Sequence, residues 1–149
     1  METRTFTFGP FVLEADIGKT ERLYKKAPFI TQGCSCDGCR SFMRAAGVFP
    51  GPVKEFFRSL GIDIRKAAEV YTISGPDETA EGLTAHYGGF CHLCGTLVKQ
   101  DPEAWYTVAE GFNVRLTDDI SLPEDGLEGP AVQIELDFCS VPWYTGMDV

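Results

Sequence analysis

Two clusters of cysteine constrain the fold of this chain more than any other feature of its sequence. "CSCDGC" at residues 34–39 has the spacing C-x-C-x-x-C, and "CHLC" at residues 91–94 has the spacing C-x-x-C. A C-x-x-C turn lets two thiolates converge on one metal ion while nearby backbone amides donate to the sulfur atoms. We therefore expect the chain to fold so that the two segments meet around one ion.

Zinc suits such a site because it favours four soft or borderline ligands in a tetrahedron. The two clusters offer six candidate ligands: Cys34, Cys36, Cys39, Cys91, His92 and Cys94. We favour Cys36, Cys39 and Cys94, followed by Cys34, with Cys91 and His92 equally placed. Four protein ligands would make a structural site, whereas three would leave a position for water or substrate.

The backbone around the second cluster decides which of its residues can bind. If "GGFCHLCG" continues a strand, His92 and Cys94 point to one face and Cys91 to the other. If the segment is a tight turn, Cys91 and Cys94 converge instead. Glycines on both sides favour the turn, and the β-prone flanking residues favour the strand.

Thiols in proteins also have roles other than metal binding. Cysteines are often small buried apolar residues, and we expect this of Cys139. A redox role would make Cys36 with Cys39, or Cys91 with Cys94, an exchange pair, which needs a lowered thiol pKa, as at a helix N-terminus. The spacing does not match the cysteine runs of ferredoxins, so iron–sulfur ligation ranks lower. His86 is expected to lie on the surface or in a turn.

Composition narrows the class of protein and its partners. The chain has 149 residues and a net charge of −9, which disfavours nucleic acid and anionic membranes as partners. It has no apolar run long enough to span a bilayer and no signal-peptide pattern, so we expect a cytoplasmic protein. Thiols stay reduced there, which favours metal or redox roles. A small-molecule thiol or another protein remains a candidate partner.

The pattern of apolar residues predicts one metal-binding domain over residues 1–149 with an α+β fold. We expect an antiparallel sheet or small β-sandwich that contains both ends of the chain, with a helical insertion around residues 37–68. Within the insertion, Asp37 is the expected cap of a short helix that ends near Gly47. A second helix is predicted from Pro52 to Gly61, and a third after Asp63.

The first cluster with its following arginine, "CSCDGCR", and the later "GGFCHLCGTL" resemble the glutathione-dependent formaldehyde-activating family. That resemblance implies that Cys34, Cys36 and Cys39 hold a catalytic zinc, and that Cys91 and Cys94 supply half of a structural zinc site. The family also uses an earlier G-x-C-x-C-G motif, and this chain has no cysteine before Cys34. The resemblance therefore implies zinc more directly than it implies glutathione chemistry.

A longer set of segments, "CSCDGCRSF", "FFRSLGIDIRKAAEVY" and "YGGFCHLCG", resembles a family of small uncharacterised bacterial proteins. This resemblance implies no particular activity. Our leading hypothesis is a small zinc-binding protein of unspecified activity. The alternatives are a zinc-dependent enzyme acting on a small thiol or carbonyl adduct, such as a carbon–sulfur lyase, and a thiol redox protein.

Overall fold

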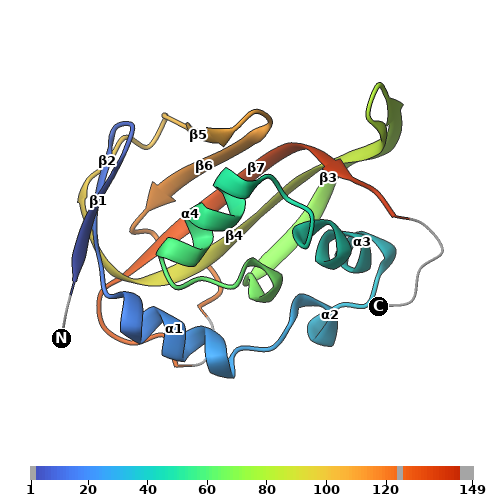
Figure 1. Cartoon of the computed structure of the whole chain (residues 1–149). Helices are drawn as coiled ribbons and strands as arrows, with labels where there is room; N and C mark the ends of the chain where they lie inside the picture. Colours follow the sequence, from blue (N-terminus) through green and yellow to red (C-terminus); the bar gives the residue numbers. More distant parts are fainter. Residues whose placement is uncertain (1–2, 124–125, 145–149) are drawn as a thin grey trace.

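The computed structural model describes residues 3–123 and 126–144 of the chain. Its described strands form one antiparallel sheet in the order β1-β2-β4-β7-β6-β5, with β3 also paired to β4 (Figure 1). The strands are β1 (Arg4–Phe8), β2 (Phe11–Ala15), β3 (Glu69–Thr79), β4 (Gly82–Lys99), β5 (Tyr106–Ala109), β6 (Phe112–Thr117) and β7 (Ala131–Pro142). The helices are α1 (Ile17–Lys26), α2 (Ile30–Gly33), α3 (Asp37–Ala46), α4 (Gly51–Ser59) and the 3₁₀ turn η1 (Ile64–Lys66). The fold is α+β and mostly β.

Strand β4 organises the sheet because it pairs along nearly its whole length. Its first half lies between β3 and β7, with Tyr87 opposite Thr72 on one side and Phe138 on the other. Its last residues pair with β2, where Gly95 lies opposite Ala15. Both the N-terminal hairpin and the C-terminal strand β7 thus join one sheet, which confirms that part of the prediction.

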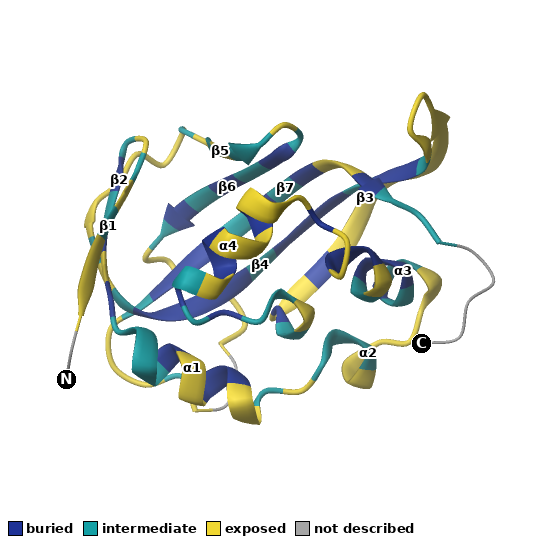
Figure 2. Ribbon diagram, in the orientation of Figure 1, coloured by how far each residue is buried: buried dark blue, intermediate teal, exposed yellow. Residues whose placement is uncertain are grey.

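One face of the sheet carries an aromatic core beneath the helices. Tyr87, Phe112 and Phe138 occupy this face because they lie opposite one another across β4, β7 and β6. The Phe42 ring of α3 lies 5.2 Å from the Tyr87 ring, and the Phe49 ring lies 5.2 Å from the Phe112 ring. Figure 2 shows this buried band along β4 and β7 behind α4. Side chains alternate along a strand, so their neighbours project from the opposite face.

The prediction of a helical insertion is correct, but the predicted start of that insertion lies too late in the sequence. Helical residues start at Ile17 in α1, about twenty positions before the predicted start at residue 37. The Asp16 side chain caps α1 by accepting from the Lys19 amide, and two lysines occupy its last turn. The polar cap and the basic last turn both stabilise α1. The helix was not predicted because its ten residues include too few apolar ones to show a clear helical pattern.

Within the insertion, the helix predicted from Pro52 is confirmed as α4, with Pro52 in its first turn. Gly47 ends α3 as expected, but Cys36 caps the start of that helix, and Asp37 is its first residue. The helix predicted after Asp63 is wrong, since only the 3₁₀ turn η1 forms before β3 begins.

Two further sequence expectations are corrected by the strands. The β-prone residues on either side of the second cysteine cluster form one continuous strand, β4, so the tight turn that the glycines favoured does not form. Cys139 is exposed on β7, not buried as expected. None of the helices in the described residues is both long and apolar enough to span a membrane.

Candidate metal centre

Cys34, Cys36 and Cys39 converge on one point between α2 and α3. Their three Sγ atoms all lie within 4.8 Å of one another. In a tetrahedral zinc site with Zn–S bonds of about 2.3 Å, sulfur atoms are separated by about 3.8 Å. A small contraction of the three thiols would therefore surround a metal ion, and the first cluster has a geometry that can hold one.

Local backbone structure sets this convergence. Cys34 ends α2, with its amide donating to the Ile30 carbonyl at 3.1 Å. Cys36 caps the N-terminus of α3, and its Sγ accepts from the Cys39 amide at 3.4 Å. Cys39 lies in the first turn of α3, one turn beyond the cap. The C-x-x-C spacing thus forms a cap in which an amide already points at a sulfur atom, as in metal-binding turns.

Two thiols of the first cluster have pKa values shifted in opposite directions. The hydrogen bond from the Cys39 amide, together with one from the Cys34 thiol, lowers the pKa of Cys36 from its ordinary value of 9.0. Burial raises the pKa of Cys39, and its hydrogen bonds with the thiols of Cys34 and Cys36 raise it further. Cys34 and Cys36 are exposed whereas Cys39 is buried. The cluster therefore stabilises one thiolate at an accessible position.

The sheet holds this segment through Tyr87 of β4. The Tyr87 hydroxyl donates at 2.7 Å to the carbonyl of Gly38, which lies in the first turn of α3 between the last two cysteines. Burial, with a smaller contribution from the charges of Cys39 and Cys36, raises the pKa of Tyr87 to about 12, so it remains a donor. About one turn further along α3, the Tyr144 amide donates to Ser41 Oγ at 3.0 Å.

The second cluster lies inside the sheet, because "CHLC" forms part of β4. Cys91 and His92 are fully buried, and Cys94 is 2 % exposed. The strand alternative is therefore the observed one, with His92 and Cys94 on one face and Cys91 on the other. Among residues 3–123 and 126–144, no group of converging metal-ligand atoms contains Cys91, His92 or Cys94. The structure does not bring the two clusters together around a shared point.

Hydrogen bonds fix the second cluster in the core. The Tyr24 hydroxyl donates to the His92 carbonyl at 2.7 Å and accepts from the His92 amide at 3.2 Å. A His92 ring nitrogen, Nε2, lies 3.0 Å from Gln133 Oε1. The Cys94 amide donates to Thr20 Oγ1 at 3.0 Å. These bonds join β4 to α1 and β7, so this segment acts as a structural centre.

A second group of converging ligand atoms comes from residues that the sequence did not single out as ligands. His86 of β4 lies with Asp137 and Cys139 of β7, and their ligand atoms all lie within 4.8 Å of one another. We expected His86 to lie on the surface or in a turn. It lies in strand β4, and its side chain is 30 % exposed. The pattern D-x-C in a predicted strand was an available signal, because residues two apart share a face.

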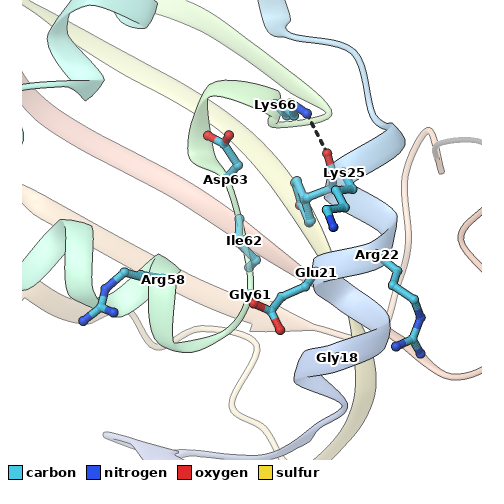
Figure 3. A pocket seen from close by; sticks show the side chains of 10 residues that line it. Gly18, Glu21, Arg22, Lys25, Arg58, Gly61, Ile62, Asp63 and Lys66 are labelled. Carbon is cyan, nitrogen blue, oxygen red and sulfur yellow. Dashed lines mark hydrogen bonds between the residues drawn. The ribbon is translucent and has the colours of Figure 1, made fainter.

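A cavity of about 560 Å³ lies between α1 and the segment from Arg58 to Lys66 (Figure 3). Its lining has four basic side chains and two acidic ones: Arg22, Lys25, Arg58, Lys66, Glu21 and Asp63. Lys66 Nζ donates to the Tyr24 carbonyl at 2.8 Å, and Arg58 pairs with Glu55. No cysteine or histidine lines this cavity, so it stands apart from both groups of metal-ligand atoms.

Comparison of the chain with protein-family models, with curated proteins and with solved structures gives no match.

Proposed function

We propose that this is a zinc-binding protein in which Cys34, Cys36 and Cys39 hold one zinc ion. The convergence of three sulfur atoms in one short segment carries this proposal. Sulfur ligands suit zinc and disfavour the hard cations calcium and magnesium, which take oxygen ligands. The amide of Cys39 already donates to Cys36 Sγ, and the pKa of Cys36 is lowered, so one ligand is prepared in its charged form.

Three protein ligands leave one position of a tetrahedral ion for an exogenous ligand. Cys34 and Cys36 are exposed, which gives a small molecule access to that position. A zinc ion bound there would act as a Lewis acid toward a thiol or a carbonyl oxygen. The resemblance of "CSCDGCR" to the formaldehyde-activating family supports the same chemistry, and an enzyme acting on a small thiol or carbonyl adduct is the function that we propose for the open position.

A thiol redox function is the second candidate, and the state of Cys36 favours it. Cys36 is exposed, caps a helix N-terminus and has a lowered pKa, as expected of an attacking thiolate. Cys34 or Cys39 would then act as the resolving thiol. In that exchange a substrate disulfide would be reduced to two thiols while two cysteines of the cluster form a disulfide.

X-ray absorption at the zinc edge of untagged Cys139→Ser protein, in which the group of His86, Asp137 and Cys139 lacks its thiol, tests the proposal and separates the candidates. We expect about one zinc per chain with three sulfur ligands and one nitrogen or oxygen ligand. Four sulfur ligands would contradict the open position. Metal-free protein in which the exposed thiols of Cys34 and Cys36 are readily titrated would contradict the zinc site and favour the redox function. The Cys139→Ser background removes an exposed thiol outside the first cluster, so the sulfur ligands that are counted belong to the first cluster.

A further inference from the structure

We propose that His86, Asp137 and Cys139 form a second site for a divalent transition-metal ion, with solvent in the remaining coordination position. The three residues supply one imidazole nitrogen, one carboxylate and one thiol, all within 4.8 Å of one another. This mixture of nitrogen, oxygen and sulfur ligands suits borderline ions such as zinc. The inference goes beyond the proposed function, since none of these residues belongs to the first cluster.

Strand pairing brings these side chains to one face of the sheet. Asp137 and Cys139 are two residues apart on β7, so both project from the same face. Asp137 is opposite Gly88 of β4 and Asn113 of β6. Phe138 lies between them in sequence and points into the aromatic core under the helices, 1 % exposed. The proposed site therefore lies on the face of the sheet opposite that core.

The distances fit an ion after a small adjustment. Cys139 Sγ lies 3.8 Å from Asp137 Oδ2, close to the separation of about 3.6 Å expected between sulfur and oxygen ligands of tetrahedral zinc. His86 Nε2 lies 2.5 Å from Asp137 Oδ1 and would have to move out to about 3.4 Å. The side chains of His86 and Asp137 are 30 % and 31 % exposed, so both can rotate by that amount and solvent can reach the ion.

A chain of hydrogen bonds orients the ligands from the neighbouring strands. Asn113 Nδ2 of β6 lies 3.5 Å from Asp137 Oδ2 as a donor and 3.9 Å from Cys139 Sγ. Thr107 Oγ1 of β5 donates to Asn113 Oδ1 at 2.7 Å, which directs the amide nitrogen toward the ligands. Partners of this kind fix the orientation of metal ligands, and their loss weakens binding by about 10–100-fold.

The same contacts argue against a nucleophilic cysteine. In such a site the thiol would be hydrogen-bonded to the imidazole that activates it. Here Cys139 Sγ is directed to Asp137, and His86 Nε2 is engaged with the same carboxylate. The carboxylate thus contacts both other groups, and the thiol and the imidazole are not paired as nucleophile and base.

Cobalt(II) tests this site, because a cobalt–thiolate bond gives a charge-transfer absorption band. A variant with Cys34, Cys36 and Cys39 all changed to Ser isolates the second site from the first. We expect this variant to bind one Co²⁺ per chain with a thiolate band, and we expect Cys139→Ser to abolish the band. His86→Gln or Asp137→Asn should each raise the Kd for Co²⁺ at least tenfold, and Asn113→Ala by about tenfold.

Glu135→Gln is the matched control, because Glu135 is a carboxylate of β7 on the same face that pairs with Arg115 instead. It should leave the Kd unchanged. Absence of the band in the triple variant, or a band that persists in Asp137→Asn and His86→Gln, would overturn the proposal. If the triple variant does not fold, the test uses the chain with the first cluster intact. In that chain, Cys139→Ser must lower the number of bound metal ions by one. Because the triple variant lacks the first cluster, failure of the second site is distinguishable from failure of the proposed zinc site.

Discussion

The two cysteine clusters have similar spacing, yet the fold gives them opposite environments. The first lies between two helices, with Cys34 and Cys36 exposed, and its sulfur atoms converge. The second lies in β4, where successive side chains point to opposite faces of the sheet, so Cys91 and Cys94 point to different faces. Both side chains are buried. A C-x-x-C pattern thus predicts a metal site only where the backbone turns, because an extended strand directs the two thiols to different neighbours.

The largest change in the free energy of unfolding is expected for a substitution in the buried strand that contains the second cluster. Leu93→Ala removes a fully buried side chain beside Cys94, so we expect the free energy of unfolding to fall by about 2–5 kcal/mol. Urea unfolding measures the change. Val98→Ala on the same strand is the control, because Val98 is exposed and should change stability by less than about 0.5 kcal/mol. Equal effects of the two variants would contradict the burial of the second cluster.

Replacing sulfur by oxygen sharpens the same comparison. Cys91→Ser puts a hydroxyl into the core, which is costlier to bury than a thiol, and should lower the free energy of unfolding by about 1–3 kcal/mol. Cys34→Ser makes the same exchange at an exposed position. In chelator-treated protein it should leave stability nearly unchanged. A destabilisation by Cys34→Ser as large as that by Cys91→Ser would show that exposure does not separate the clusters.

Tyr87 links the two regions, and its removal has a smaller effect. Tyr87→Phe deletes the hydrogen bond to the Gly38 carbonyl and should lower the free energy of unfolding by about 0.5–1.5 kcal/mol. Thermal unfolding with and without added zinc measures it. Tyr71→Phe is the matched control on β3, where the side chain is half exposed. An unchanged stability in Tyr87→Phe would mean that the sheet does not hold the thiol segment.

The last prediction concerns the relative alkylation rates of two thiols in the first cluster and involves no substitution. Alkylation requires the thiolate, and the lowered pKa of Cys36 means that its thiolate persists below pH 9.0. At any one pH below 9.0 in metal-free protein, Cys36 should therefore react faster than Cys39, whose pKa is raised. Mass spectrometry of iodoacetamide-treated protein identifies the modified residue. Faster modification of Cys39 than of Cys36 would contradict this order.

The sequence predicted the features that depend on local pattern. The α4 helix follows from Pro52 and the spacing of Val53, Phe56 and Phe57, and those side chains are buried as that spacing requires. The first cluster was also predictable, because C-x-C-x-x-C places its thiols within one short turn. Local spacing decides both cases, so no knowledge of the sheet was needed.

The sequence could not decide features that depend on strand pairing. "GGFCHLCG" is compatible with a turn or a strand, and only its pairing with β7, where Cys91 lies opposite Ile134, makes it a strand. His86 and Asp137 are far apart in sequence and meet only through the β4–β7 register. The α1 helix was missed because its stabilising contacts, such as the bond from the Tyr24 hydroxyl to the His92 carbonyl, are tertiary.

Zinc content in paired variants of the two clusters tests the central claim most directly. Elemental analysis of untagged protein, with the second site removed by Cys139→Ser, should give about one zinc per chain. Cys36→Ser should lose that zinc, and Cys94→Ala should keep it, because Cys94 is buried in β4 away from the converging thiols. Loss of zinc in both variants would contradict the claim and would mean that the two clusters share one ion.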